Sequence, residues 1–476
     1  MSFLHSYNKL LKSTVIALSI CFLSAPPAHA MSTYIKGAHN VNFTKYDDLT
    51  TNNPAIGSLS EARRAGLGEN DWSTGKLQRL AYYTPTTKIP GTEISGYFDD
   101  CNFVIRVPDK WNGRLVVVGA PGFGIARSAD ALISDYVLTK TDAKGGSYAY
   151  AVCDKGTIGE NIPDPDGKMY SWAPAMNAFD HKDDSLEEWN VRFSQLTAAA
   201  REVLQKTKKQ LPAYTYIWGY SNGGYVTRYA MEKHPELYSG MLDWEGVLWR
   251  GKEKNLISSL TTAVNAWEVM KNPKATAQDK SQAVGKLTNM GVDPKASFLW
   301  PIHGAYYWLP TLNVHRMKYD PQFVKRNWWE FLSHPEDYKD YKWFTRSAAV
   351  KKIVALENTG KITKPTITVH GTMDSLLFPA VHAKAYEELV KKNGDINQYR
   401  LYMVANGNHF DSFVGNPKLD PNHILQPLLP YVHQSFDILV DWVEKGNPAP
   451  KSLTIVKPSS PDQAYDIRTG KETAKY

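Results

Sequence analysis

Residues 214–231 read YTYIWGYSNGGYVTRYAM, and this stretch decides the fold. An apolar run at 214–218 leads into GYSNG at 219–223, the only G-x-S-x-G of the chain, and a helical pattern follows it. On a sharp strand-to-helix turn, a serine is lifted clear of the backbone while the flanking glycines let neighbouring elements approach closely. The stretch therefore predicts a nucleophile elbow with Ser221 at its tip.

Short apolar runs and helical patterns alternate along much of the remaining chain. The strand-length runs lie at 103–107, 115–118, 148–152, 366–369 and 399–404, and the helical patterns at 185–206 and 431–443. Strands that alternate with helices favour a mostly parallel sheet, because the crossing helices cover both of its faces. We therefore expect an α/β fold.

Two strand ends supply the partners that a serine nucleophile needs. A serine requires a base, and a carboxylate must orient that base. In elbow proteins the chain order is serine, acid, histidine. Asp374 follows the strand at 366–369, and His409 follows the strand at 399–404. Because ligands bind at the carboxyl ends of parallel strands, we predict a catalytic triad of Ser221, Asp374 and His409.

Other residues compete for the acid and base roles. Asp411 is so close to His409 in sequence that the two side chains should point apart. Asp243 also follows a possible strand soon after the elbow helix and remains an alternative acid. His370 is interpreted as a structural histidine at a strand end. The histidines without a matching strand-end setting are His303, His382, His423 and His433.

The tetrahedral intermediate of acyl transfer needs backbone N–H donors for its oxyanion. The N–H of Asn222, immediately after the nucleophile, should supply one of them. The strand at 115–118 runs into a glycine-rich loop at 119–124, so the second donor is expected at Gly122 or Phe123. This loop lacks the Lys-Ser/Thr ending of a phosphate-binding P-loop.

The composition argues against a metal, a cofactor or a nucleic-acid partner. The formal net charge is +7, and lysines are scattered in short clusters that are typical of solvated helix faces. No cluster of histidine and cysteine has the spacing of a zinc site. We therefore expect a protein that works without a bound metal or cofactor.

The N-terminus has the pattern of an export signal. Lys9 and Lys12 precede an apolar stretch at 14–23 that is too short to span a bilayer, and an A-x-A cleavage site ends at Ala30. Cleavage of residues 1–30 would give a secreted or periplasmic protein without a stable membrane anchor. An uncleaved anchor is the alternative.

Two cysteines remain after removal of the signal, which carries Cys21. Cys101 opens one predicted strand and Cys153 closes another. An even number of cysteines in an oxidising compartment favours a disulfide between them. The alternative is a pair of buried thiols.

The chain divides into a core and two additions. Residues 31–95 are polar and rich in turns, which indicates an N-terminal extension that wraps the core. Residues 245–350 break the strand–helix rhythm and are helical in pattern. We interpret the latter as a lid or cap inserted into an α/β core made of residues 96–244 and 351–476.

The predicted cap is rich in tryptophan. Together with Trp244 at its edge, it holds eight of the 14 tryptophans of the chain. These rings either line a substrate cleft or form the core of the cap itself. Tyr307 and Trp308 are the candidates for substrate contact.

With these motifs the chain resembles the α/β-hydrolase superfamily over about residues 100–245 and 360–450. Within it, the chain is similar to secreted tannase and feruloyl-esterase-like hydrolases. That similarity lies in the double glycine of 219–224, the CDKGT turn at 153–157 and the C-terminal segment 436–448. The resemblance implies an α/β-hydrolase fold and a Ser-His-Asp esterase.

One departure concerns the neighbours of the serine and the histidine. Tannase-like enzymes typically place disulfide-linked cysteines there, whereas this chain has Tyr220 and Phe410. Tyr220 is therefore a further candidate for substrate contact. Bacterial hydrolases of polyester or hydroxyacid oligomers fit equally well, so aromatic, phenolic and hydroxyacid-oligomer esters are all expected substrates. The alternatives are a serine peptidase of the same fold and a non-catalytic binding protein.

Overall fold

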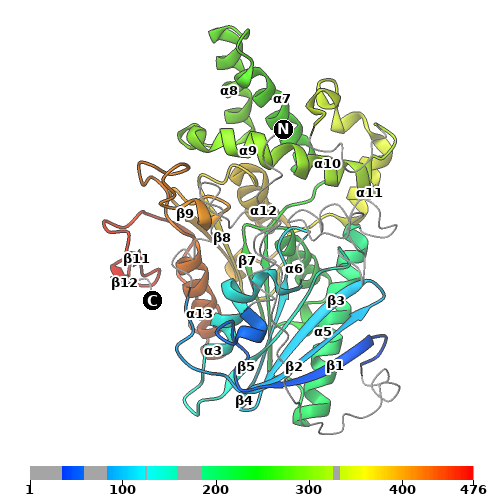
Figure 1. Cartoon of the computed structure of the whole chain (residues 1–476), viewed down its shortest axis with the longest axis vertical. Coiled ribbons are helices and arrows are strands. Elements are labelled where there is room, and N and C mark those ends of the chain that lie inside the picture. Colours follow the sequence, from blue (N-terminus) through cyan, green and yellow to red (C-terminus); the bar gives the residue numbers. More distant parts are fainter. Residues whose placement is uncertain (1–34, 58–82, 124–125, 158–184, 325–332, 475–476) are drawn as a thin grey trace, which may run out of the picture.

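The computed structural model describes residues 35–57, 83–123, 126–157, 185–324 and 333–474. These residues form a ten-stranded sheet of order β1-β2-β3-β5-β4-β6-β7-β8-β9-β10. Neighbouring strands are antiparallel from β1 to β5 and parallel from β5 to β10 (Figure 1). The strands are β1 (His39–Tyr46), β2 (Gly91–Phe98), β3 (Cys101–Pro108), β4 (Trp111–Gly119), β5 (Ser147–Cys153), β6 (Tyr214–Tyr220), β7 (Gly240–Trp244), β8 (Thr366–Gly371), β9 (Tyr399–Val404) and β10 (Leu453–Ile455). A separate hairpin pairs β11 (Gln463–Tyr465) with β12 (Glu472–Ala474).

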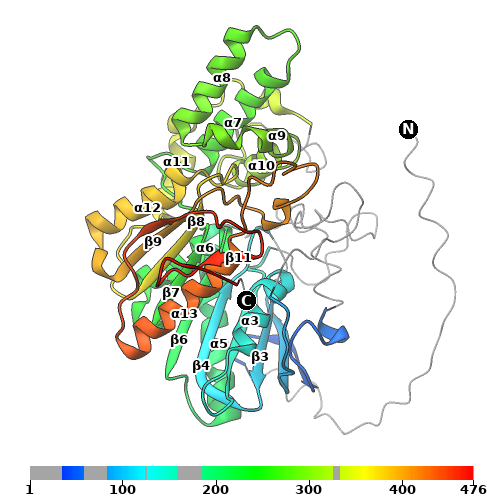
Figure 2. The same cartoon turned by 90° about the vertical axis from the view of Figure 1, so that its left-hand side faces the viewer.

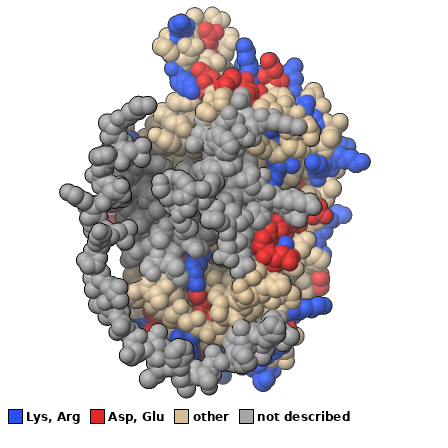
Figure 3. Space-filling view, turned by 45° about the vertical axis from the view of Figure 1, so that its right-hand side comes forward, with Lys and Arg blue, Asp and Glu red and all other residues tan. Residues whose placement is uncertain are grey.

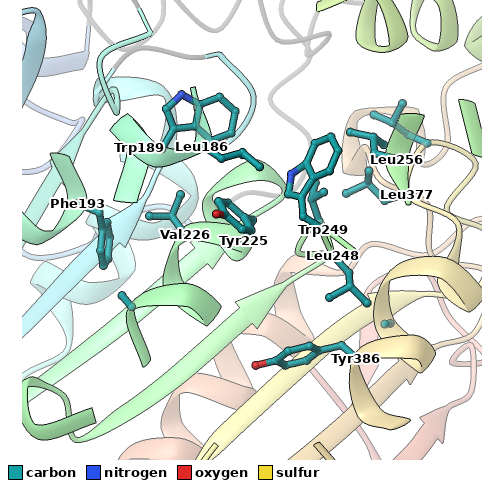
Figure 4. Packing of buried hydrophobic residues seen from close by; sticks show 14 of the residues in the cluster. Leu186, Trp189, Phe193, Tyr225, Val226, Leu248, Trp249, Leu256, Leu377 and Tyr386 are labelled. Carbon is teal, nitrogen blue, oxygen red and sulfur yellow. The ribbon is translucent and has the colours of Figure 1, made fainter. Parts of the chain in front are cut away.

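Helices cover both faces of this sheet, as expected for the α/β class. Along β4, Val117 packs into one hydrophobic cluster while Val116 and Val118 pack into the other, because successive strand residues point to opposite faces. The first cluster includes residues of the helices α5 (Leu186–Lys208), α6 (Asn222–Lys233) and α12 (Pro379–Asn393), and the second includes residues of α3 (Asp135–Thr139) and α13 (Leu429–Lys445). Figure 4 shows part of the first cluster, with side chains of α5 and α6 side by side. The predicted fold class is confirmed.

The ends of the long helices follow local sequence signals. Ser185 caps α5 by accepting a hydrogen bond from the N–H of Glu188. At the other end of the core, Gly446 stops α13 in a left-handed conformation with a φ of 69°. The helix ends at 185 and 446 were therefore readable from the sequence.

The N-terminal segment is more regular than its sequence suggested. Strand β1 and the start of β2 lie within residues 31–95 and pair as an antiparallel edge of the sheet. Of the eight residues of β1, only Val41 is buried, Phe43 and Tyr46 are partly buried, and the five polar residues are exposed. Such an exposed edge strand carries little hydrophobic periodicity, which is why the polar, turn-rich pattern of this segment did not indicate a strand at 39–46.

Residues 245–350 contain a group of helices above one end of the sheet (Figures 1 and 2). We call α7 to α11 the α7–α11 segment: α7 (Leu256–Lys271), α8 (Ala277–Met290), α9 (Trp300–Tyr306), α10 (Trp308–Tyr319) and α11 (Ser347–Leu356). Trp249, Trp300 and Trp343 are buried in the first hydrophobic cluster. These three rings therefore form core; Trp328 and Trp329 lie outside the described residues.

The surface shows both signs of charge. On the face drawn in Figure 3, basic and acidic side chains of the described residues lie near one another. None of the helices within the described ranges is long and apolar enough to cross a membrane. The predicted export signal at 1–30 lies outside the described residues.

Candidate active site

Ser221 occupies the tip of a tight turn between β6 and α6. Its φ of 57° and ψ of −119° are strained for a residue with a side chain, a feature that persists only where the surroundings enforce it. The N–H of Ser221 donates to the carbonyl of Trp244 at 2.9 Å, and its carbonyl accepts from the N–H groups of Gly224 and Val247. The turn is thus held from both sides, with the serine at the start of α6.

The glycines around Ser221 are required by close packing of backbone on backbone. A Cβ atom on Gly223 would lie 1.9 Å from the carbonyl oxygen of Gly119, at the end of β4. A Cβ on Gly219 would lie 2.4 Å from the carbonyl oxygen of Gly223. Helix α6 can therefore approach β4 and β6 only because these positions lack side chains.

The structure brings Ser221, His409 and Asp374 into one hydrogen-bonded chain. Nε2 of His409 lies 3.1 Å from Oγ of Ser221, and Nδ1 lies 2.9 Å from Oδ2 of Asp374. An ionised carboxylate only accepts hydrogen bonds, so Nδ1 carries the proton and Nε2 is left to accept the serine proton. Burial by itself raises the pKa of Asp374, but the charge and hydrogen bond of His409 outweigh it and lower that pKa to about 2.

Local hydrogen bonds fix the loops that carry the acid and the base. Oδ1 of Asp374 accepts from the N–H groups of Leu376 at 2.8 Å and Leu377 at 2.7 Å, which leaves Oδ2 for His409. The carboxylate of Asp411 instead accepts from two N–H groups where α13 begins, so it points away from the imidazole. This arrangement agrees with the expectation that the Asp411 and His409 side chains diverge.

The alternative residues for the acid and base roles, Asp243 and His370, form hydrogen bonds or ion pairs with other parts of the structure. Asp243 forms a buried ion pair with Arg228 at 2.5 Å and accepts a hydrogen bond from Thr368. Nε2 of His370 donates to the carbonyl of Leu377 at 2.8 Å, and burial lowers its pKa. Neither residue contacts Ser221 or replaces a member of the chain described above.

A second carboxylate beside His409 was missed by the sequence analysis. Glu245 directly follows β7, and its Oε2 lies 3.4 Å from Nδ1 of His409. Burial raises its pKa well above the usual value, and the negative charge of Asp374 raises it further. One side-chain atom each of Glu245, His370 and Asp374 lie within 4.8 Å of one another. The alternative acid predicted from the sequence, Asp243, lies two residues earlier, within β7.

The glycine loop after β4 lies beside the elbow. Gly119 touches Gly223, and Gly122 has a φ of 53° in the left-handed region that favours glycine. Phe123 packs its ring on Trp189 of α5 at 5.6 Å. Asn222 is the first residue of α6, where N–H groups have no acceptor within the helix. The assignment of oxyanion donors to Asn222 and to Gly122 or Phe123 stays a prediction.

The three residues predicted to contact substrate occupy different environments. Tyr307 packs against Phe410 with ring centroids 4.6 Å apart, next to His409. Trp308 is fully buried, and its indole N–H donates to the carbonyl of Ser375 at 2.6 Å. Its N–H thus joins the α7–α11 segment to the acid loop, and the contact of Tyr307 and Trp308 with substrate stays a prediction.

Tyr220 connects the elbow to the histidine loop. Its hydroxyl donates to the carbonyl of His409 at 2.8 Å, and its ring stacks on Trp244 with centroids 4.0 Å apart. Both partners are buried, so the hydrogen bond is shielded from water. Tyr220 therefore has a structural task at the site in addition to any contact with substrate.

Tyr220→Phe should lower kcat about 10-fold while keeping the stack on Trp244. The lost hydrogen bond is worth about 1 kcal/mol and leaves a buried carbonyl without that donor, so His409 is held less firmly. Steady-state kinetics and thermal unfolding test this. Tyr402→Phe is the matched control, because it removes a 2.8 Å bond to the carbonyl of Pro450. Equal kcat losses in both variants would contradict the positioning role.

The predicted disulfide is not formed, since Cys101 and Cys153 are buried free thiols. Cys153 pairs with Phe103 across the ladder, so Cys101 is its diagonal neighbour. Diagonal positions lie about 7–8 Å apart, at the limit of disulfide geometry. Burial raises the pKa of the Cys101 thiol, and a hydrogen bond with Cys153 raises it further.

Two solved structures share the fold of this chain. An esterase from Aspergillus oryzae has a TM-score of 0.52 at 12% identity, covering 92% of this chain and 90% of that one. Feruloyl esterase B from Aspergillus oryzae has a TM-score of 0.53 at 11% identity, covering 94% and 93%. At such identities the likeness shows the fold alone. A sheet of this order with a serine elbow makes the chain an α/β-hydrolase.

Matches to particular families cover parts of the chain. Residues 339–467 match the 3HB-oligomer hydrolase family, and residues 183–299 match the prolyl oligopeptidase family. The D-(-)-3-hydroxybutyrate oligomer hydrolases of Burkholderia mallei and Burkholderia pseudomallei are 35% identical over 94 residues. That stretch covers 19% of this chain and 13% of each relative. The chain thus matches only a small part of the length of these curated relatives.

Proposed function

We propose that this protein is a serine hydrolase that cleaves carboxylic esters through Ser221, His409 and Asp374. The observation that carries the proposal is the pair of hydrogen bonds at 3.1 and 2.9 Å that joins the three side chains at a nucleophile elbow. Relatives that are themselves oligomer hydrolases, and esterases of the same fold, support it.

The reaction follows from the geometry. Oγ of Ser221 attacks the ester carbonyl carbon while its proton passes to Nε2 of His409. Asp374 stabilises the resulting imidazolium, and N–H groups at Asn222 and the glycine loop bind the oxyanion. The carbon–oxygen bond then breaks, and the alcohol leaves with the proton from His409. Water, activated by the same imidazole, hydrolyses the acyl-enzyme and frees Ser221.

Esters of hydroxyacid oligomers are the substrates that the matches favour. The 3HB-oligomer hydrolase match at 339–467 includes both Asp374 and His409. Aromatic and phenolic esters are the second class, since feruloyl esterase B shares the fold. The signal pattern at 1–30 supports export to the periplasm or the medium, where such oligomers and esters would be met.

A serine peptidase is the second candidate function. The prolyl oligopeptidase match at 183–299 includes Ser221, and the same triad cleaves amides in peptidases. The two activities differ in the leaving group, which is an alcohol in one case and an amine in the other. A direct comparison of esters with amides therefore separates them.

We expect a fluorophosphonate probe to label the protein once, with the label mapped by mass spectrometry to Ser221. Competition kinetics should then rank 3-hydroxybutyrate dimers and trimers, feruloyl and galloyl esters, short-chain esters and prolyl peptide amides. Absence of labelling would favour a binding protein. Labelling together with hydrolysis of the amides alone would replace the esterase by a peptidase.

A further inference from the structure

Two buried carboxylates meet one imidazole at this site. Nδ1 of His409 lies 2.9 Å from Oδ2 of Asp374 and 3.4 Å from Oε2 of Glu245. Both acids are fully buried. The reaction proposed above uses only Asp374, so the position of Glu245 needs its own explanation.

The backbone holds Glu245 in this position at some cost. Its φ of 47° is unfavourable for a residue with a side chain. Its N–H donates to the carbonyl of Val369 at 2.9 Å, and its Oε1 accepts from the N–H of Gly371 at 3.1 Å. Two points on β8 thus fix the side chain, and Oε2 is the oxygen left facing His409.

The charges around Glu245 allow only one of the two acids to be ionised. Asp374 faces it directly, with Asp411 as a further negative charge, and His409 is the nearest group that can become positive. His370 is kept neutral because burial lowers its pKa. Two neighbouring carboxylates in a buried site, here those of Glu245 and Asp374, cannot both be ionised. The pKa directions agree, since that of Glu245 is raised and that of Asp374 is lowered.

We propose that Glu245 is a positioning residue that keeps a proton beside Asp374 and can itself orient His409 when Asp374 is absent. In the wild type, the neutral Glu245 confines the negative charge to Asp374. Without Asp374 the opposing negative charge is gone, so Glu245 ionises more readily and accepts a hydrogen bond from Nδ1–H of His409. This inference rests on the proposed function, because its readout is ester hydrolysis.

The test is a double-variant cycle on the full chain. We expect Asp374→Ala to lower kcat about 10- to 100-fold, whereas loss of the only acid of a triad typically costs about 10⁴-fold. Glu245→Gln should cost a few-fold, since glutamine mimics the neutral acid. The double variant should fall to about 10⁴-fold below the wild type. If Asp374→Ala fails to fold, Asp374→Asn keeps the volume of the side chain.

A matched control separates this role from general destabilisation. Glu188 also has a raised pKa, because it is buried, and it contacts Arg192 rather than the triad. Asp374→Ala combined with Glu188→Gln should match Asp374→Ala alone. If Asp374→Ala is already as inactive as the double variant with Glu245→Gln, the proposal is overturned. An inactive, unlabelled wild type would instead overturn the proposed function.

The dependence of kcat on pH is a second readout. It would not change if Glu245 had a purely structural role. Glu245 can orient His409 only as a carboxylate, so in Asp374→Ala activity is present above the pKa of Glu245 and lost as the pH falls through it. Burial keeps that pKa raised, while in the wild type Asp374 remains ionised at low pH. The acidic limb of kcat should therefore lie at a higher pH in Asp374→Ala. Coincident limbs would contradict the proposal.

Discussion

Replacing Ser221 by alanine lowers kcat for ester hydrolysis by about 10⁴-fold or more, because the attacking oxygen 3.1 Å from His409 is gone. The substitution removes one oxygen from a buried site and leaves the hydrogen bond between His409 and Asp374 intact. The free energy of unfolding should therefore change by less than about 1 kcal/mol. Initial rates on the best ester of the panel and thermal unfolding measure both effects.

The control for this result tests whether the losses of kcat in Ser221→Ala and His409→Ala add up in the double variant. His409→Ala should cost about as much as Ser221→Ala, and the double variant should be no slower than either one, because the two residues act as a unit. Additive losses would show that the residues contribute separately and that the proposed triad is not the catalytic unit. Wild-type rates in Ser221→Ala would assign any esterase activity to another site.

The main features of the site were readable because each one depends on local sequence. Ser221 is marked by its glycines, which pack against β4 and β6. Asp374 and His409 each follow an apolar strand of a parallel sheet, and parallel strands end at a common edge. Ser221 and His409 lie 188 positions apart in sequence. Their hydrogen bond could nevertheless be predicted, because the chain order of the residues and their places at strand ends bring them to one edge of the sheet.

Glu245 could not be assigned from the sequence, for a physical reason. Strand alternation would direct Glu245 to the same face as Asp243, which pairs with Arg228 below α6. A φ of 47° at Glu245 breaks this alternation and turns the side chain toward His409. A left-handed conformation at a residue other than glycine carries no sequence signal, because packing enforces it.

The burial of individual side chains in the α7–α11 segment was equally hard to predict from the sequence. Tyr306, Tyr307 and Trp308 follow one another in sequence, yet Tyr306 is 47% exposed while Trp308 is fully buried. The difference arises because Trp308 begins α10 and packs on the acid loop through the carbonyl of Ser375. That contact joins segments 67 residues apart, so no local pattern could indicate it.

Gly223→Ala should lower the free energy of unfolding by about 3 kcal/mol or more and abolish ester hydrolysis. The added Cβ would lie 1.9 Å from the carbonyl oxygen of Gly119 and 2.8 Å from that of Ala120. All of these neighbours are backbone atoms at the end of β4, so no change of side-chain rotamer relieves the overlap, and α6 must move away from the sheet. Such a movement displaces Ser221 from His409. Chemical denaturation and fluorophosphonate labelling measure the two effects.

Gly285→Ala is the matched control for this glycine. Gly285 lies within α8, and a Cβ placed there would meet no atom within 4 Å. Since alanine is favoured over glycine inside a helix, this variant should gain about 0.5–1 kcal/mol of stability and keep full activity. A Gly223→Ala variant as stable and active as Gly285→Ala would show that α6 and β4 do not pack as closely as described, and the geometry of the elbow would then need revision.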